Sequence, residues 1–438
     1  MTDVLSPTAA RRVLLSLTFS RWFPVGLVVG VITLWILDRG LTISQALLAF
    51  SLQGIVVFLL ELPTSGFADA FGRRPMLIAS AVVNVIAAAV MIAADSFWYF
   101  VAAAALQGAF RALDSGPLEA WFVDTVHVTE PGADVDRTLA AQGSMLGGSI
   151  AVGAVISGGL IAWDPLPSAS ALLLPMLCWG ALNVLHLAAV VALMKEPRTH
   201  VGVTGARRAA DSVREAPVVI RDGLGLLRSN RVLRYVVLVE VFWTAALVVF
   251  ETFQPIRLAE LVGGEEQAGA LMGPVAAVGW GVFAAGSALA GLSSRRFGVA
   301  RTAIAARILN GLGAVTMGLV AGPVALIAAY LFTYSMHGTG GPMHATLMHR
   351  EASAANRATV LSMGSMVFFA TFSILGPPLG LLAEATSTQV SMVVAGAFSV
   401  IGALLYLPAL RAEREQPPVE SPVNPVESPR NRVESPGI

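Results

Sequence analysis

Twelve long apolar segments dominate this sequence, and each is long enough to cross a lipid bilayer. A helix needs about 20 apolar residues to cross the hydrocarbon core, where unpaired backbone polar groups are too costly to persist. Because these segments are also too long for barrel strands, the sequence predicts an all-α membrane protein with twelve transmembrane helices. The segments lie at about residues 12–37, 44–64, 76–94, 97–122, 139–163, 168–194, 232–256, 267–292, 301–321, 323–347, 357–383 and 387–410.

The composition argues against a soluble fold. Only 13% of the 438 residues are charged, whereas soluble domains carry about 25%. The first apolar segment, from Val13 to Leu37, is too long for a signal peptide, and no small-residue cleavage site follows it. We therefore interpret this segment as the first membrane helix.

Positive charges gather on one side of the predicted membrane. The opposite side has only Arg39 and Arg257. Because Lys and Arg are enriched in cytoplasmic loops, we expect both termini in the cytoplasm and the chain in the plasma membrane. The residues on the basic side are Arg11, Arg12, Arg73, Arg74, Arg137, Lys195, Arg198, Arg207, Arg208, Arg214, Arg221, Arg228, Arg231, Arg234, Arg295, Arg296, Arg301, Arg350 and Arg357.

Polar stretches divide the chain into four expected parts. Two sets of six helices, 1–194 and 232–410, flank a cytoplasmic linker at 195–231. Within the linker, Ser212 to Leu227 is either an amphipathic helix on the inner leaflet or a basic solvated segment. Residues 411–438 repeat Val-Glu-Ser-Pro three times and have few large apolar residues, so we expect a disordered cytoplasmic tail.

The two halves share short motifs at a nearly constant offset. With six predicted helices in each half, the repeat implies two bundles of parallel topology. A pseudo-two-fold axis along the membrane normal relates such bundles. The matching pairs are Phe71-Gly72 with Phe297-Gly298, Gly116-Pro117-Leu-Glu119-Ala with Gly341-Pro342-Met-His344-Ala, Asp136-Arg137 with Asn356-Arg357, and Gly143-Ser-Met145 with Gly364-Ser-Met366.

The loop that ends at Arg74 resembles the loop between the second and third helices of the major facilitator superfamily. The family pattern is Gly, three residues, Asp, Arg, any residue, Gly, Arg, Arg. Asp69, Gly72, Arg73 and Arg74 fit it, while Ser65 and Ala70 depart from it. The resemblance is closest to the drug-efflux branch, through Glu61-Leu-Pro-Thr and Ser115-Gly-Pro-Leu-Glu-Ala-Trp-Phe-Val-Asp124.

That resemblance implies a gating charge relay on the cytoplasmic side. Carried over to this chain, the relay consists of Asp69, Gly72, Arg73, Arg74 and Asp124, and it latches the two halves in the outward-open state. Two positions depart from the branch's motifs. Ala104 stands where the fourth helix should carry arginine, with Arg111 further along, and the fifth helix lacks Gly-Pro.

Charged residues inside predicted helices are candidates for proton coupling. Each charge at the bilayer centre costs about 2.5–3.5 kcal/mol on insertion scales, so a function is expected to retain it. Asp114 and Glu251 are the first choices because both lie well inside their helices, where desolvation favours a protonated carboxyl group. Arg111 and Asp114 could instead simply pair with each other. The full candidate set is Asp114, Glu251, Glu240, Arg111, Glu119 and Arg21, and Glu61 is also embedded.

We expect Gln53, Gln107, Trp243 and Gln254 to line the substrate cavity. Glu240 and Glu251 are eleven residues apart, which places them on one helix face about 16 Å apart. With Trp243 and Gln254 near the same stripe, this face suggests a cavity wall. In the alternative, each acid pairs with Arg21, Arg111 or a backbone group and only fixes helix packing.

Several other functions find no support in the sequence. The only lysine, Lys195, is outside any phosphate-binding loop, so we expect no ATP hydrolysis through one. We found no nucleophile–histidine–acid order. His344 and His349 are five residues apart, unlike a metal-binding pair, and Cys178 is the only cysteine. We therefore expect no enzyme activity, cofactor or metal, and the zero net charge argues against nucleic acid as a partner.

The sequence thus favours a proton-coupled exporter of amphiphilic small molecules, such as antibiotics, that works by alternating access. Its expected partners are its substrate, protons and the lipid bilayer, and it is expected to be a monomer. A proton-coupled importer of a small metabolite is the first alternative. A non-transporting membrane sensor or scaffold is the second, although a sensor would be expected to carry a large folded soluble domain.

Overall fold

The structure, a computed structural model, describes residues 5–65, 67–196, 205–353 and 356–415, and all their regular secondary structure is helical. The elements before residue 196 are α1 (Pro7–Val28), α2 (Ile32–Asp38), α3 (Ile43–Ser65), α4 (Phe67–Phe71), α5 (Arg73–Ala93), α6 (Phe97–Asp114), α7 (Pro117–Thr129), α8 (Asp136–Trp163) and α9 (Leu173–Leu193). The later elements are α10 (Ala206–Ser229), α11 (Arg231–Leu247), the π-helix η1 (Val248–Phe253), α12 (Gln254–Val262), α13 (Glu265–Phe297), α14 (Val299–Leu319), α15 (Pro323–Arg350), α16 (Arg357–Ala385), α17 (Thr388–Ile401), the 3₁₀-helix η2 (Gly402–Tyr406) and α18 (Leu407–Glu415).

Most of these helices are long and apolar enough to cross a membrane. Within the described residues, nine helices or continuous helical runs meet that criterion, and α1 with α2, bent by 41°, gives a tenth. The two remaining predicted spans correspond to α6 with α7 and to α15. Polar residues such as Arg111 and His344 lower the hydropathy of these two segments. The chain is therefore a multi-pass membrane protein.

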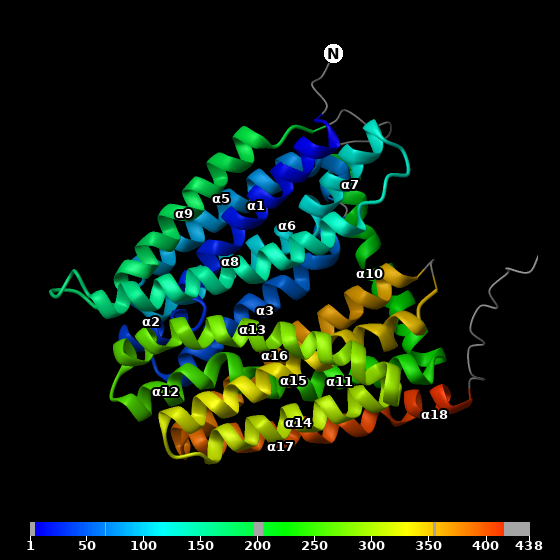
Figure 1. The fold of residues 1–438 in the computed structure, drawn as a ribbon. Coiled ribbons are helices and arrows are strands. Elements are labelled where there is room, and N and C mark those ends of the chain that lie inside the picture. The colour runs from blue at the N-terminus through cyan, green and yellow to red at the C-terminus, as the bar shows by residue number, and fades with distance from the viewer. Residues whose placement is uncertain (1–4, 66, 197–204, 354–355, 416–438) are drawn as a thin grey trace, which may run out of the picture.

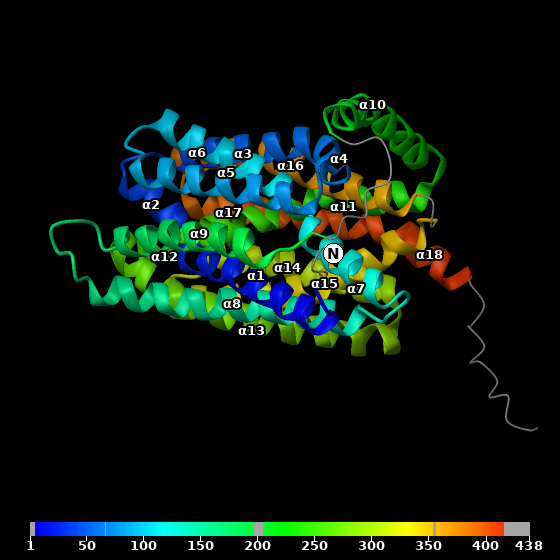
Figure 2. The same ribbon diagram turned by 90° about the horizontal axis from the view of Figure 1, so that it is seen from above.

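The helices form two groups that lie side by side (Figure 1). The first group, α1 to α9, has α1 packed on α8 and α6 packed between α3 and α5. The second group, α11 to α18, has α15 packed between α13 and α14. The groups meet mainly through α3 against α16 and α8 against α13, and α10 lies beside both of them at one end (Figure 2).

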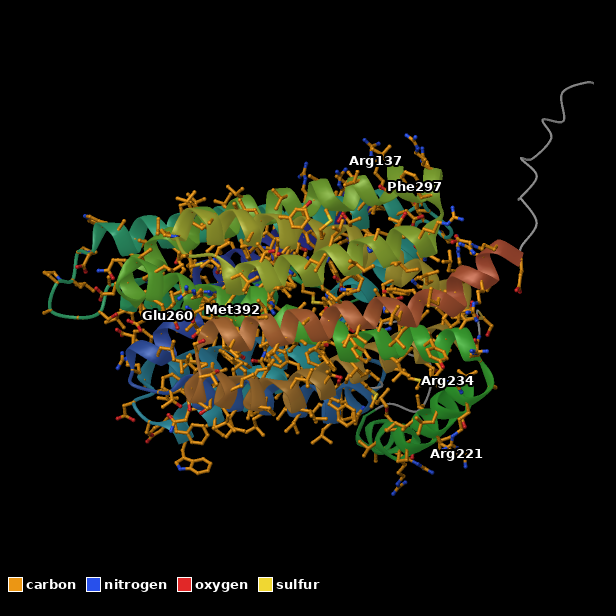
Figure 3. All side chains as sticks on the ribbon, turned by 90° about the horizontal axis from the view of Figure 1, so that it is seen from below. Arg137, Arg221, Arg234, Glu260, Phe297 and Met392 are labelled. Carbon is orange, nitrogen blue, oxygen red and sulfur yellow. The ribbon has the colours of Figure 1, made fainter. Side chains whose placement is uncertain are left out.

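The molecule has two different ends. We call one the basic end; it holds the junction of α4 with α5, α10 and α18, and Arg137, Arg221 and Arg234 lie toward it (Figure 3). The far end holds Glu260 and the loop at 164–172 (Figures 1 and 3). The two groups of helices diverge toward the basic end and converge toward the far end (Figure 1).

Glycines bring the two groups into backbone contact near the far end. A Cβ added to Gly273 of α13 would lie 2.7 Å from Cα of Gly158 of α8. A Cβ added to Gly380 of α16 would lie 2.7 Å from Cα of Ser44 of α3. The backbone N–H of Ser44 also donates to Glu384 at 2.7 Å. Small residues thus allow the close approach of the two groups near this end.

Three predicted helices are less regular than their apolar patterns indicated. The first, 12–37, is broken at residues 29–31, where Gly30 has a φ of +76° that favours glycine. The fourth, 97–122, breaks before Pro117, and α7 then continues to Thr129. The seventh, 232–256, contains η1 and extends through α12 to Val262.

Parts of the predicted linker and of the predicted tail are also helical. The predicted linker at 195–231 contains α10, so its central part is a helix. The predicted start of a disordered tail at residue 411 was too early, because α18 continues to Glu415. The Val-Glu-Ser-Pro repeats lie outside the described residues.

Candidate functional site

A cavity of about 470 Å³ lies within the first group of helices. Six of the predicted site residues line it: Gln53, Gln107, Arg21, Arg111, Asp114 and Glu119. Aromatic and aliphatic side chains such as Trp22, Phe110 and Trp179 form much of the remaining wall. The cavity therefore combines apolar surface with a few polar and charged groups.

An ion pair between α1 and α6 is the main charged feature of this cavity. The Nε atom of Arg21 lies 2.9 Å from Oδ2 of Asp114, and both side chains are largely buried. The guanidinium of Arg21 also stacks over the rings of Trp22 and Phe110, at 4.8 and 4.3 Å from their centroids. The pair thus neutralises two charges inside the membrane region, and the aromatic rings hold the arginine in place.

The pairing of Arg111 with Asp114, which the sequence left open as an alternative, is not formed, since Asp114 pairs with Arg21. The guanidinium of Arg111 lies over the ring of Phe369 in α16, 5.1 Å from the centroid. Residues three positions apart on a helix differ by about 60° in direction, and here Asp114 faces α1 while Arg111 faces the second group. Within one turn of α6, Asp114 therefore forms an ion pair inside the first group, whereas Arg111 contacts the second group.

A hydrogen-bonded ladder of amides crosses the cavity wall. Gln107 donates to Asn84 of α5 at 3.2 Å, and Asn84 donates to Asn183 of α9 at 3.0 Å. Nearby, Nδ1 of His186 lies 2.8 Å from the hydroxyl of Ser20. Asn84, Asn183 and His186 were not among the predicted site residues, although each is a polar residue within an apolar segment.

Two other acids of the first group bond to neutral partners. Glu119 accepts a hydrogen bond from Gln142 of α8 at 2.6 Å. Glu61 accepts one from Ser365 of α16 at 2.9 Å, which crosses from the first group to the second. Together with the contact of Arg111 on Phe369, this bond joins the two groups on the α16 side of the molecule.

In the second group, Glu240 pairs with a histidine instead of Arg21 or Arg111. Its Oε1 atom is 2.9 Å from Nε2 of His344 in α15, and Nδ1 of that ring is 2.8 Å from the hydroxyl of Tyr406. Arg307 of α14 is also buried and lies over Trp243, 5.1 Å from the ring centroid. Arg307 was missed, although it is a charge inside the apolar segment 301–321.

Glu251 lies in the π-helix η1 and is hydrogen-bonded to Tyr334. The π-helical turn that begins at Val248 has more residues per turn than an α-helix. Glu240 and Glu251 are therefore not on one continuous α-helical face, as the sequence had suggested. His337 lies in the same region within a group of aromatic rings. Its ring centroid is between 5.2 and 5.8 Å from those of Trp243, Phe250, Phe283 and Tyr334.

Trp243 and Gln254 are not among the residues that line the cavity of the first group. Trp243 stacks on His337 at 5.2 Å, and Gln254 is fully buried at 0% exposure. Within the described residues, both amide atoms of Gln254 lack a hydrogen-bond partner. These two candidates therefore remain predictions, away from that cavity.

The predicted charge relay lies at the basic end of the first group. Nη2 of Arg73 is 3.5 Å from Oδ2 of Asp124, and Nη2 of Arg74 donates to the carbonyl of Val191 at 2.8 Å. Gly72 has a φ of +97°, which favours glycine. The side chain of Asp69 lies outside the described residues, although its backbone belongs to α4.

The structure adds Glu196 to this region. Its carboxylate accepts the backbone N–H of Arg73 at 2.5 Å and that of Arg74 at 3.3 Å, so it caps the N-terminus of α5. Glu413 does the same in the second group, where it accepts the N–H groups of Val299 and Ala300, each at 3.0 Å. Gly72 and Gly298 are therefore each followed by a helix whose N-terminus is capped by a carboxylate from the last segment of the same group.

A comparison with family models gives the identity of the fold. The model described as Major Facilitator Superfamily matches residues 14–371. The chain belongs to this superfamily. No match to a curated protein was found.

Solved structures of other transporters share the fold at low sequence identity. The nucleoside transporter NupG is 12% identical with a TM-score of 0.72, covering 92% of this chain and 99% of that one. A POT family transporter in complex with 5-aminolevulinic acid is 13% identical with a TM-score of 0.71, covering 93% and 96%. The peptide transporter POT in complex with sulfate is 14% identical with a TM-score of 0.72, covering 92% and 95%.

The described residues contain no group of three or more His, Cys, Asp or Glu side chains placed to hold a metal ion. The features available for function are therefore the cavity, its ion pair, the buried acids and the joints between the two groups.

Proposed function

We propose that this chain is a secondary active transporter that exports amphiphilic small molecules in exchange for protons. The observation that carries the proposal is the cavity of the first group, where the Arg21–Asp114 ion pair lies among aromatic and aliphatic walls. Its volume, about 470 Å³, falls in the range of about 300–1,000 Å³ that is typical of small-molecule sites.

The proposed architecture has twelve transmembrane helices in two six-helix bundles, related by a pseudo-two-fold axis along the membrane normal. Transport follows alternating access, in which the two bundles rock around a central site. The contacts of Gly158 with Gly273 and of Ser44 with Gly380 support a state that is closed at the far end. In the proposed orientation the basic end is cytoplasmic, so this state faces inward, in a plasma-membrane monomer.

Proton coupling is assigned first to Asp114 and Glu251, with Glu240, Glu119, Arg111 and Arg21 as further candidates. When Asp114 takes a proton, its ion pair with Arg21 is lost and the arginine is free to find another partner. When Asp114 releases the proton, the pair forms again. The local contacts then differ between the two protonation states, as a coupled equilibrium between conformations requires.

The relay of Asp69, Arg73 and Asp124, supported by Gly72 and Arg74, is proposed to stabilise the outward-open state. The contact of Arg73 with Asp124 supports the part of this relay that lies within the first group. A charge pair biases the equilibrium only if it is stronger in one state than in the other. The proposed latch therefore requires a partner that approaches when the basic end closes.

Import of a polar metabolite is the second candidate. The ladder from Gln107 through Asn84 to Asn183 favours it, because such amides can exchange partners with a hydrogen-bonding solute. The resemblance to nucleoside and peptide transporters is compatible with this reading, although it shows the fold alone.

Assays of drug susceptibility and accumulation in whole cells distinguish the two functions. For an exporter, expression lowers accumulation of an amphiphilic antibiotic, and a protonophore abolishes the difference. For an importer, a protonophore-sensitive uptake of nucleosides, peptides or related metabolites appears instead. Proteoliposomes that show neither activity under an imposed pH gradient would overturn both transport proposals and favour the sensor or scaffold.

The orientation is tested by cysteine labelling in a Cys178→Ser background. Ser168→Cys lies in the exposed loop at the far end and should react with a membrane-impermeant reagent added to intact cells. Arg295→Cys lies at the basic end of α13 and should react only after permeabilisation. The reverse pattern would invert the proposed orientation.

A further inference from the structure

The surface of α10 is divided into stripes of different chemistry. Residues four or seven positions apart lie on one face of an α-helix. Exposed arginines recur at every seventh position, at Arg207, Arg214, Arg221 and Arg228. A second stripe holds three exposed apolar residues, Val213, Ile220 and Leu224, and a third holds the acids Asp211, Glu215 and Asp222. A fourth exposed apolar residue, Val218, lies between the arginines and the acids.

The remaining face of α10 packs against both groups of helices. The hydroxyl of Ser212 donates to the carbonyl of Pro63 in α3 at 3.4 Å. Gly223 lies so close to α16 that an added Cβ would be 2.3 Å from the sulfur of Met363. Ser212 and Gly223 are both buried, so the face of α10 that carries them points toward the bundles. This defines the rotation of the helix about its axis.

That rotation places the stripes in a definite order. At about 100° per residue, the apolar stripe lies about 90° to one side of the packed face, and the acidic stripe lies about 90° to the other side. The arginine stripe is opposite the packed face, and Arg221 points away from the bundles in Figure 3. The apolar stripe and the acidic stripe are thus about 180° apart, as in a helix that separates lipid from water.

The location of α10 agrees with such a boundary. It lies at the basic end, beside the lateral surface that α3 and α16 present (Figure 2). Both of these helices are candidate membrane spans, and both expose large apolar residues, such as Leu59 and Ile374. The edge of a bilayer around these spans would therefore reach the level of α10.

We propose that α10 lies on the membrane surface and binds anionic lipid headgroups. The apolar stripe enters the boundary of the acyl chains, the arginines contact headgroup phosphates, and the acids face water. Each arginine near an anionic surface contributes about a fivefold preference for it. This proposal goes beyond transport, since it assigns a lipid-binding surface to the segment that joins the two groups.

The position of α10 in the bilayer is tested with nitroxide labels on the full-length protein. Single labels replace Ile220 or Asp222 in a Cys178→Ser background, and the protein is reconstituted in phosphatidylcholine with about one quarter phosphatidylglycerol. The label at Ile220 should collide more with oxygen than with a water-soluble nickel complex, and the label at Asp222 should show the reverse. Water-like values at both positions would show a solvated linker and overturn the proposal.

The role of the arginines is tested by replacing all four of them with glutamine. The ratio of phosphatidylglycerol to phosphatidylcholine that copurifies with the protein should fall about fivefold or more. Arg295→Gln with Arg296→Gln is the matched control, because these exposed arginines lie at the same end on α13. If the fourfold variant is not monodisperse, Arg214→Gln with Arg221→Gln replaces it.

The outcomes separate lipid binding from general charge effects. An equal loss of phosphatidylglycerol in the control variant, or no loss in the α10 variants, would overturn the assignment to anionic headgroups. Since none of these measurements uses a transported substrate, failure of the proposed transport function would leave this test intact.

Discussion

Glu240 and His344 form a buried pair in the second group, with 2.9 Å between Oε1 and Nε2. The other ring nitrogen of His344 lies 2.8 Å from the hydroxyl of Tyr406. The imidazole of His344 thus lies between a carboxylate of α11 and a tyrosine hydroxyl of η2, and it connects three helices of the second group.

Removal of the histidine should destabilise the protein more than removal of both partners. His344→Gln leaves the buried Glu240 side chain without the ring that faces it, which costs about 3 kcal/mol in the free energy of unfolding. The double variant Glu240→Gln/His344→Gln should recover more than half of that loss, because it no longer buries a carboxyl group that lacks its partner. Unfolding in detergent measures both effects, and equal stability of the single and double variants would contradict an energetic coupling between the pair.

The two carboxylate caps should contribute to stability in parallel. Glu196→Ala removes the acceptor for the first N–H groups of α5, and Glu413→Ala does the same for α14. Each change should lower the free energy of unfolding by about 1–2 kcal/mol, the range of a lost helix cap. Glu415→Ala, at an exposed position in the last turn of α18, is the control and should leave the melting temperature unchanged. A normal melting temperature in both cap variants would show that water replaces the carboxylates.

The course of the chain was largely predictable, because local sequence determines it. Backbone hydrogen bonds must be satisfied inside the membrane, so each apolar segment had to form a helix. The break before Pro117 follows from the geometry of proline, and Arg21, Asp114 and Gln107 were selected because polar groups in an apolar segment are costly.

The partners of these side chains were not predictable in the same way. Arg21 and Asp114 are 93 residues apart, and the packing of α1 against α7, which directly follows α6, brings them together. The pairing of Arg111 with Asp114 was left open as a local alternative, but Asp114 pairs with Arg21 of α1 and Arg111 lies over Phe369 of α16. The π-helix at Glu251 likewise has no signature in the apolar pattern.

The glycine contact at the far end should control which conformations the protein can reach. A Cβ at Gly158 would lie 2.7 Å from the carbonyl oxygen of Ala270, so Gly158→Val should separate α8 from α13 there. Gly159→Val is a matched control, since an added Cβ at Gly159 meets no atom within 4 Å. Spin labels at Thr42 and Thr386 are expected to move apart by several ångströms in the Gly158 variant alone.

The same substitution, Gly158→Val, should also reduce transport. A variant that cannot close the far end should bind substrate but lose alternating access, so transport falls while the Gly159 control keeps normal activity. Unchanged label distances with normal transport in Gly158→Val would show that the backbone contact is not needed for closure.

Amide substitutions at Asp114 and Glu251 test whether these acids couple transport to protons. An amide keeps the shape of a carboxyl group but cannot take up or release a proton, so it removes the titration with little change in packing. Asp114→Asn should abolish accumulation or efflux driven by a pH gradient and leave substrate binding measurable. Glu251→Gln should have the same effect if the acid in the π-helix is the coupling site.

The two variants separate the two halves of the molecule, because Asp114 lies in the first group and Glu251 in the second. Loss of coupling in one variant alone assigns the proton to that half, whereas loss in both indicates that the sites act together. Glu130→Gln, an exposed change after α7, controls for the removal of one negative charge. Substrate exchange without a gradient should persist in a variant that is only uncoupled, since exchange needs the conformational change but no net proton movement. If both amide variants, singly and together, transport normally across pH, these acids are structural and the coupling site lies elsewhere.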